Sequence, residues 1–175
     1  MKTNLVRATL ITIVILFLLP SFYFAGQVIY TSNKKNNAVT TPSINKKASS
    51  KMLQGNPLAN FTPLPSIPEL KTEDITPGTG DEVQKGATVT TDYTGAVAAT
   101  GIVFQSSKDS GQPVSFGLDQ VIKGWTEAIP GMKVGGTRRL FIPAALAYGA
   151  NPPAGAGIPA NADLVFDVTV YKTGK

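Results

Sequence analysis

Val121-Ile122-Lys123-Gly124-Trp125 opens a segment with helical spacing in a chain otherwise rich in strand patterns. Apolar residues recur at that spacing from Val121 to Ile129, and Pro130-Gly131 then ends the segment. The sequence therefore predicts a single short helix over 121–129.

Segments on both sides of this helix have the character of β-strands. In the stretch 86–98, Val89, Tyr93 and Val97 recur at even spacing, as on one face of a strand. Gly and Pro pairs separate the remaining candidates, which are 71–75, 102–105, 114–118, 137–142 and 164–171. One sheet with one amphipathic helix predicts an α+β fold in which the helix covers the apolar face of the sheet.

Composition excludes several kinds of chemistry. The chain has no Cys and no His, so thiol nucleophiles, Ser-His-Asp triads and Cys/His zinc sites cannot occur. Residues 1–70 carry seven Lys or Arg against one acid, whereas residues 71–175 carry nine against ten acids. Because the basic excess lies outside the folded part, we expect no nucleic-acid binding. The Lys46-Lys47 and Arg138-Arg139 pairs are expected to be solvated.

The amino-terminal residues 1–30 have the character of a membrane segment. Residues 8–30 carry no charge, and as a helix they would extend about 34 Å, enough to cross a bilayer core. The alternative is a cleaved signal peptide, but Tyr23 or Phe24 would then occupy a position that prefers a small residue. We therefore favour an uncleaved anchor with the carboxyl-terminal part outside the cytoplasm. Secretion after cleavage is the alternative.

Two further regions follow this segment. Residues 31–68 are rich in Asn, Lys, Thr, Ser and Pro with little hydrophobic periodicity, which predicts a disordered linker. Residues 69–175 have the length of one small domain. No internal repeat is evident, and a monomer is expected.

Aromatic and branched side chains in this domain could line an apolar pocket. They are unaccompanied by a nucleophile–base pair, so a reaction in the pocket cannot depend on such machinery. Rotation about a prolyl peptide bond meets that condition, because its barrier arises from amide resonance and no proton need be transferred.

The same residues resemble the FKBP-type peptidyl-prolyl cis-trans isomerases. The resemblance covers about Gly86 to Tyr171, and it rests on six pieces in order: Tyr93-Thr94-Gly95, Phe104-Gln105-Ser106-Ser107, Val121-Ile122-Lys123-Gly124-Trp125, Ala147-Tyr148-Gly149, Ile158-Pro159 and Leu164-Val165-Phe166-Asp167. It implies an antiparallel half-barrel sheet wrapped around one short helix, with the prolyl pocket between them.

The resemblance also assigns roles to residues. It implies catalytic roles for Tyr93, Phe104, Gln105, Trp125, Tyr148 and Phe166, and substrate contacts by Val114, Val121, Ile122 and Ile158. Trp125 resembles the residue that forms the floor of the prolyl pocket in the family. Tyr148 resembles the family's hydroxyl donor to a ligand carbonyl, and the backbone N–H of Ile122 resembles a second hydrogen-bond donor to the ligand. Substrates would be proline-containing polypeptides, macrolide-type ligands could bind the same site, and no cofactor or metal is implied.

Two departures from the family pattern bear on activity. The family usually has Asp where this chain has Gln105, and often an aromatic residue where it has Val114. Loss of the carboxylate leaves a second function open, namely a catalytically weak chaperone or adaptor that grips proline-containing segments. A small-molecule carrier is a third, remote alternative. Without the ordered pieces, Trp125 and Phe166 would be interpreted as ordinary core residues.

Overall fold

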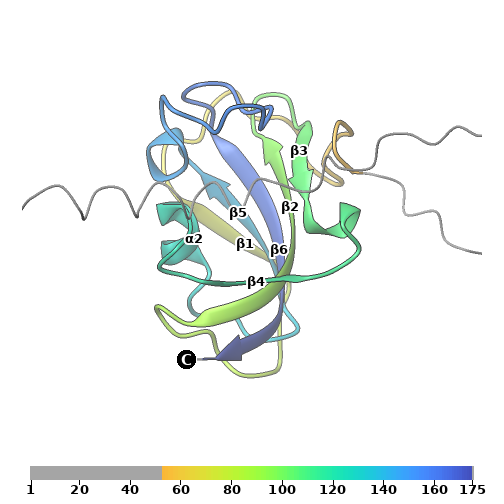
Figure 1. The fold of residues 1–175 in the computed structure, drawn as a ribbon, viewed down its shortest axis with the longest axis vertical. Helices are drawn as coiled ribbons and strands as arrows, with labels where there is room; N and C mark the ends of the chain where they lie inside the picture. Colours follow the sequence, from red (N-terminus) through yellow and green to blue (C-terminus); the bar gives the residue numbers. More distant parts are fainter. Residues whose placement is uncertain (1–52, 175) are drawn as a thin grey trace, which may run out of the picture.

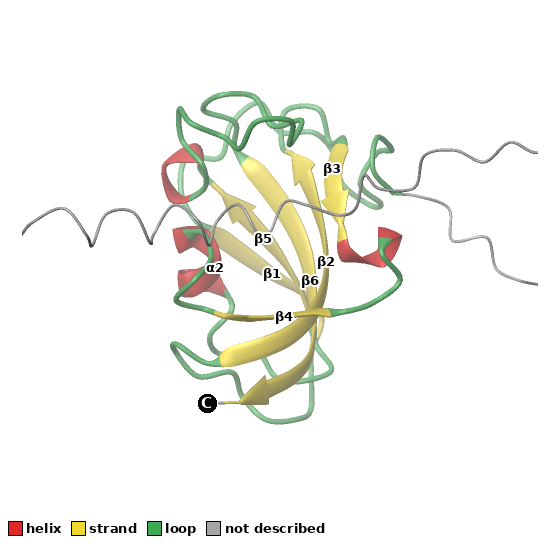
Figure 2. Ribbon diagram, viewed as in Figure 1, coloured by secondary structure: helices red, strands yellow, loops and turns green. Residues whose placement is uncertain are grey.

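The computed structural model describes residues 53–174. In this part a curved antiparallel sheet packs against one short α-helix, α2, as Figure 1 shows. The bounds of the elements are β1 Lys71–Thr76, β2 Thr88–Val97, β3 Val103–Ser106, β4 Val114–Gly117, α2 Lys123–Ala128, β5 Thr137–Ile142 and β6 Leu164–Gly174. Two single-turn 3₁₀ helices, η1 Ser107–Asp109 and η2 Ala144–Leu146, interrupt the connections (Figure 2).

The strand order explains how the sheet encloses the helix. The order is β1-β5-β6-β2-β3, and β4 pairs with β2 beside the β2–β3 pairing. The long strands β2 and β6 pair along most of their lengths and form the middle of the sheet. Strands β3 and β4 lie one after the other along the same edge of β2, and β4 leads the chain to α2 (Figure 1).

The sequence-based prediction of an antiparallel sheet with one small helix is confirmed in residues 53–174. The helix is shorter than the predicted 121–129. Ile122 has extended backbone angles (φ −61°, ψ 148°), so the first helical residue is Lys123, and Ile129 closes the carboxyl end. Strand β5 has the predicted bounds, and β6 continues past its predicted end at Tyr171.

Both faces of the sheet are covered. On the face toward α2, residues such as Leu140, Phe166 and Val168 form the main core. On the opposite face, Val165 packs with the segment 53–68. Strand β6 is therefore buried over 164–166 without alternation, which is the pattern of a strand covered on two sides.

The segment 53–68 belongs to this packed unit. Its Leu58 and Ile67 are buried, only 5% and 6% exposed, against Ala96, Val103 and Val165. The sequence predicts the domain to begin at Glu69, with a linker before it, whereas the structure begins the packed unit further upstream. Spaced apolar residues in a Pro-rich segment are enough to cover the outer face, although they show no period.

The predicted hydrophobic helix over 8–30 and most of the predicted linker lie outside the described residues. None of the helices in residues 53–174 is long and apolar enough to cross a bilayer.

Candidate active site

Four strands and the helix bring five aromatic rings together. Trp125 of α2 lies at the centre, with its ring centroid 5.2 Å from Phe166 of β6, 5.4 Å from Tyr93 of β2 and 5.2 Å from Phe116 of β4. Phe104 of β3 contacts Phe166 edge-on at 5.7 Å. All five side chains are at most 7% exposed. Edge-to-face contacts of this kind favour the packing beyond the area buried.

Gly95 of the Tyr93-Thr94-Gly95 piece makes room for two of these rings. A Cβ at this position would lie 2.6 Å from the ring of Phe166 and 2.7 Å from the ring of Phe104. No real side chain tolerates such contacts, so only glycine permits both rings to lie over β2. The residue therefore sets the spacing of the aromatic cluster.

The helix that presents Trp125 is fixed at both ends. At its start a Cβ on Gly124 would lie 2.5 Å from the side chain of Ile142 of β5, so the helix backbone packs directly against that side chain. At its end the guanidinium Nη1 of Arg138 donates to the carbonyl of Ala128 at 2.9 Å. The indole Nε1 of Trp125 is buried without a hydrogen-bond partner.

The side-chain hydroxyls of two serines hydrogen-bond to the backbone of Tyr93 and hold it in place. The backbone N–H of Tyr93 donates to the Ser107 hydroxyl oxygen at 2.9 Å, and the Ser106 hydroxyl donates to the Tyr93 carbonyl at 3.0 Å. The Ser107 hydroxyl in turn donates to the Asp92 carboxylate at 2.9 Å. The Phe104-Gln105-Ser106-Ser107 piece therefore places one aromatic ring and anchors the strand that carries another.

The remaining predicted residues lie around this cluster. Ile158 is buried within it, whereas Val114, Val121, Ile122 and Tyr148 pack against it and are only partly buried. With Gln105, which is also partly buried, these side chains form the part of the predicted site that is most exposed to solvent. The structure thus brings together the nine apolar and aromatic residues that the sequence predicts.

Gln105 lies on the same side of the sheet as the aromatic rings. It pairs directly with Gly95, whose missing Cβ would point at Phe104 and Phe166. Directly paired residues in a sheet present their side chains to the same face. The register shifts before Ala96 pairs with Val103, so Phe104 is the additional residue of a β-bulge. The bulge lets neighbouring residues Phe104 and Gln105 both serve the site.

The two tyrosines of the site keep their protons at neutral pH. Burial raises the pKa of Tyr93 to about 12, and the nearby Tyr148 adds to the rise. Burial also raises the pKa of Tyr148. Removing a phenol from water disfavours the charged phenolate, so each hydroxyl remains a hydrogen-bond donor over the physiological range. Within residues 53–174, no group of three Asp or Glu side chains is placed to hold a metal ion.

The expectation that Arg138-Arg139 is solvated is wrong. Arg139 is 8% exposed. It forms a bidentate ion pair with Asp167 on the outer face, with nitrogen–oxygen distances of 2.7 and 2.8 Å. This pair raises the pKa of Arg139. Arg138 pairs with Asp74 of β1 at 2.5 Å. Alternation along β5 sends one guanidinium to each face, and both faces are covered.

Sequence reasoning also missed Phe116, which lies as close to Trp125 as any other ring. Its signal was present, because Phe116 and Leu118 alternate with polar or small residues along the predicted strand 114–118, and both are buried.

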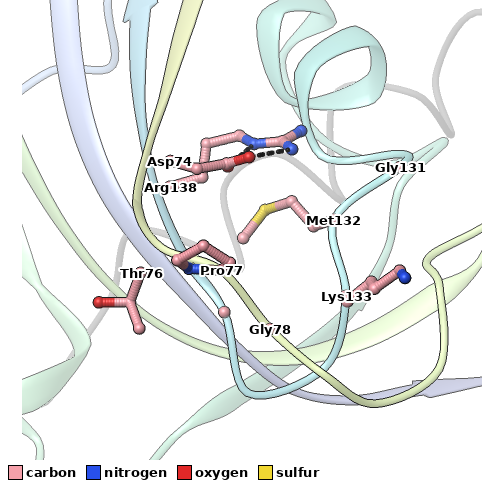
Figure 3. A pocket seen from close by; sticks show the side chains of 9 residues that line it. Asp74, Thr76, Pro77, Gly78, Gly131, Met132, Lys133 and Arg138 are labelled. Atoms are coloured by element: carbon pink, nitrogen blue, oxygen red, sulfur yellow. Dashed lines mark hydrogen bonds and ion pairs between the residues drawn. The ribbon is translucent and has the colours of Figure 1, made fainter.

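A separate pocket of about 270 Å³ contains none of the predicted site residues (Figure 3). Its lining combines the Asp74–Arg138 ion pair with Met132, Lys133 and backbone from Gly78. It shares no aromatic ring with the cluster around Trp125. The aromatic cluster therefore remains the candidate active site.

Known proteins match the region that carries this cluster. A family model described as FKBP-type peptidyl-prolyl cis-trans isomerase matches residues 80–171. An FK506-binding protein of Neisseria meningitidis is 46% identical over 102 residues, which cover 57% of this chain and 92% of that protein. A probable FKBP-type peptidyl-prolyl cis-trans isomerase of Haemophilus influenzae is 50% identical over 93 residues, covering 53% and 38%.

Solved structures agree with these sequence matches. A peptidyl-prolyl cis-trans isomerase from Pseudomonas syringae superposes with a TM-score of 0.56 at 32% identity, covering 64% of this chain and 80% of that one. FkpA from Escherichia coli gives a TM-score of 0.54 at 40% identity, covering 59% and 47%. With its aromatic cluster in the matched region, the chain belongs to the FKBP-type peptidyl-prolyl cis-trans isomerases and is an enzyme of that class.

Proposed function

We propose that this isomerase acts on X-Pro bonds of exported or envelope proteins and that it lowers the barrier by desolvating the bond and stabilising its twisted state. The observation that carries the mechanism is the set of buried rings around Trp125, formed in a chain without His or Cys. Such a site offers an apolar surface and fixed hydrogen-bond donors, and it has no imidazole or thiol to transfer a proton.

The physical basis lies in amide resonance. A planar imide resists rotation by about 18–20 kcal/mol because resonance is lost when it twists. The planar form is strongly polar, and the twisted form has lost much of its charge separation. An apolar site therefore disfavours the ground state more than the twisted state, and each ~1.4 kcal/mol of this difference gives a tenfold increase in rate.

Five of the predicted residues have a specific role in this scheme. The proline ring would rest on Trp125 and contact Phe166, which meet at a right angle and are both buried. Tyr148 would donate its hydroxyl to a substrate carbonyl, since burial keeps that hydroxyl protonated. The N–H of Ile122 would hold a second carbonyl and keep the peptide bent. Gln105, on the same face, would supply an amide in place of the carboxylate that the family resemblance leads us to expect.

Turnover on a short peptide such as Ala-Leu-Pro-Phe tests this function. The full chain in detergent should accelerate prolyl exchange, and Trp125→Ala should remove most of the acceleration. A catalytically weak binding protein is the second candidate, favoured by Gln105 in place of Asp. It would bind the peptide, visible as a change in the fluorescence of the chain's single Trp, without accelerating exchange. That result would replace the enzymatic proposal by the second candidate.

We further propose that macrolide-type ligands occupy the same aromatic site. Relatives from Neisseria meningitidis and Streptomyces anulatus are named FK506-binding proteins. A macrolide that shares the site should compete with the tetrapeptide and inhibit exchange. Inhibition that peptide concentration cannot relieve would place the ligand elsewhere.

The proposed location follows from residues 8–30, an uncharged run long enough to span a bilayer. We propose that this run anchors a monomer with its catalytic domain outside the cytoplasm. Protease should then digest the domain when it is added to cells whose outer envelope has been permeabilised and whose cytoplasmic membrane is intact. The full-length protein should sediment with membranes. Full-length protein in the cytosolic fraction would contradict the anchor.

A further inference from the structure

A segment upstream of the family match runs across the outer face of the sheet. We call residues 53–68 the strap. Leu58 and Ile67 are its buried apolar contacts, and the guanidinium of Arg139 donates to the carbonyls of Ala59 and Asn60 at 2.9 and 2.6 Å. The strap is thus fixed by side chains that come from strands far along the sequence.

Two carboxylates hold the ends of the strap through its backbone N–H groups. At the amino end, Asp109 accepts from Leu53 at 2.7 Å and from Gln54 at 3.0 Å. At the carboxyl end, Asp163 accepts from Ile67 at 2.6 Å. The second oxygen of Asp163 does not return to the strap. It accepts from the backbone N–H of Ala144 at 2.8 Å.

Ala144 begins the loop that presents Tyr148. The carbonyl of Ala144 accepts from the backbone N–H of Ala147 at 3.1 Å and of Gly149 at 2.9 Å, the two residues that flank Tyr148. Gly149 has a left-handed backbone (φ 54°), and its carbonyl accepts from Asn161 at 2.7 Å. One residue, Ala144, therefore connects Asp163 to the backbone on both sides of the candidate donor tyrosine, through its N–H on one side and its carbonyl on the other.

We propose that Asp163 is a positioning residue for prolyl isomerisation, and that it fixes the Tyr148 loop against the strap. The inference rests on the role proposed for Tyr148. A carboxylate can accept one hydrogen bond on each oxygen, whereas an asparagine side chain has a single carbonyl oxygen and an NH₂ group that only donates. Because the strap and the loop donate to different oxygens of Asp163, an asparagine in the same orientation can accept from only one of them.

The experiment compares Asp163→Asn with Asp109→Asn in the full chain. Each of these carboxylates accepts hydrogen bonds from two backbone N–H groups. For Asp109 both belong to the strap, and for Asp163 one does. Each substitution removes one negative charge and one acceptor oxygen. Only Asp163 also binds the Tyr148 loop. Asp163→Asn should lower kcat/KM for tetrapeptide exchange about threefold to tenfold, up to the loss expected when the Tyr148 hydroxyl is removed, since small misplacements of positioning groups have large kinetic effects. Asp109→Asn should leave kcat/KM unchanged at a comparable loss of Tm.

Ala144→Pro provides a second route to the same contact. Proline is tolerated at the first position of a helical turn, and it removes only the N–H that Asp163 accepts from the loop. Ala144→Pro should lower kcat/KM about as much as Asp163→Asn, and the double variant should be no worse than either. Additive losses in the double variant would show that the two residues act separately.

Tyr148→Phe distinguishes failure of this inference from failure of the site assignment. If Tyr148→Phe loses activity while Asp163→Asn and Ala144→Pro keep wild-type kcat/KM, the positioning role is wrong and the role of Tyr148 stands. If Tyr148→Phe keeps full activity, the hydroxyl has no role and the inference falls with it. If Asp163→Asn does not fold, Ala144→Pro alone decides, because it leaves the bond from Ile67 intact.

Discussion

The indole ring of Trp125 and the phenyl ring of Phe166 meet at 90°, with their centroids 5.2 Å apart. One ring comes from the helix and the other from the central strand β6, so this contact joins the two layers of the domain. The same two rings form the proposed binding surface for the proline ring of the substrate. Substitutions here will therefore change stability and activity together, and informative variants must separate the two.

Tyr148→Phe removes one hydroxyl and leaves the ring in place. If that hydroxyl holds a substrate carbonyl, kcat/KM should fall about threefold to tenfold, which corresponds to one hydrogen bond of roughly 0.5–1.5 kcal/mol. The free energy of unfolding should change little. Tyr171→Phe is the matched control, because it removes the hydroxyl that donates to Asp92 on β2 and Tyr171 is 48% exposed. Equal kinetic losses in the two variants would argue against a specific role for Tyr148.

Gly95→Ala should displace the aromatic rings. The added methyl group would meet both Phe104 and Phe166 at less than 3 Å. Overpacking of this kind costs about 1–3 kcal/mol, measurable by urea unfolding, and exchange activity should fall as well. Gly174→Ala, at the end of β6, meets nothing within 4 Å and should stay within about 0.5 kcal/mol of wild type. A fully stable and active Gly95→Ala would show that the rings can move without loss.

Gln105→Asp introduces the carboxylate that the resemblance to the family leads us to expect at this position. Because Gln105 faces the aromatic cluster, a carboxylate there would be a stronger hydrogen-bond acceptor for the bound peptide, and kcat/KM should rise severalfold. Gln112→Asp adds the same charge at an exposed position and should have no effect. Activity that is unchanged or lower in Gln105→Asp would show that the amide serves this site as well as a carboxylate.

Burial of Tyr93 predicts a loss of stability at high pH. Its pKa is raised from 10.0 to about 12 in the folded protein, so between these values the folded state binds more protons than the unfolded state. The stabilisation is complete below about pH 10 and is lost as the pH rises through about 12. Urea unfolding across this range should show the decrease, and Tyr93→Phe should make it smaller. An equal decrease in both proteins would assign it to other groups.

Local patterns were sufficient to predict the sheet and the helix. Strand 137–142 alternates and follows Gly135-Gly136, and the helix is closed by Pro130-Gly131, so both elements carry their own boundaries. The helix start was placed too early because Val121 and Ile122 have the apolar spacing of a helix. Ile122 instead has extended backbone angles, which place it outside the helix at the N-cap position.

The strap could not be predicted, because its partners are distant in the sequence. Ile67 donates to a carboxylate 96 residues away, and the carbonyl of Ala59 accepts from a guanidinium 80 residues away. No period or motif within 53–68 reports such contacts. For the same reason the Arg139–Asp167 pair appeared to be surface charge, although each residue lies in a predicted strand. The aromatic site was predictable because the resemblance specifies its members one by one.

The pH and solvent-isotope dependence of prolyl exchange tests the desolvation mechanism most directly. If the rings around Trp125 act by removing the imide from water, kcat/KM of the full chain should be flat from about pH 6 to 9 and nearly equal in H₂O and D₂O, since no proton moves. A bell-shaped profile together with a clear isotope effect would mean that a group in the site transfers a proton, and the account of catalysis by an apolar surface would be wrong.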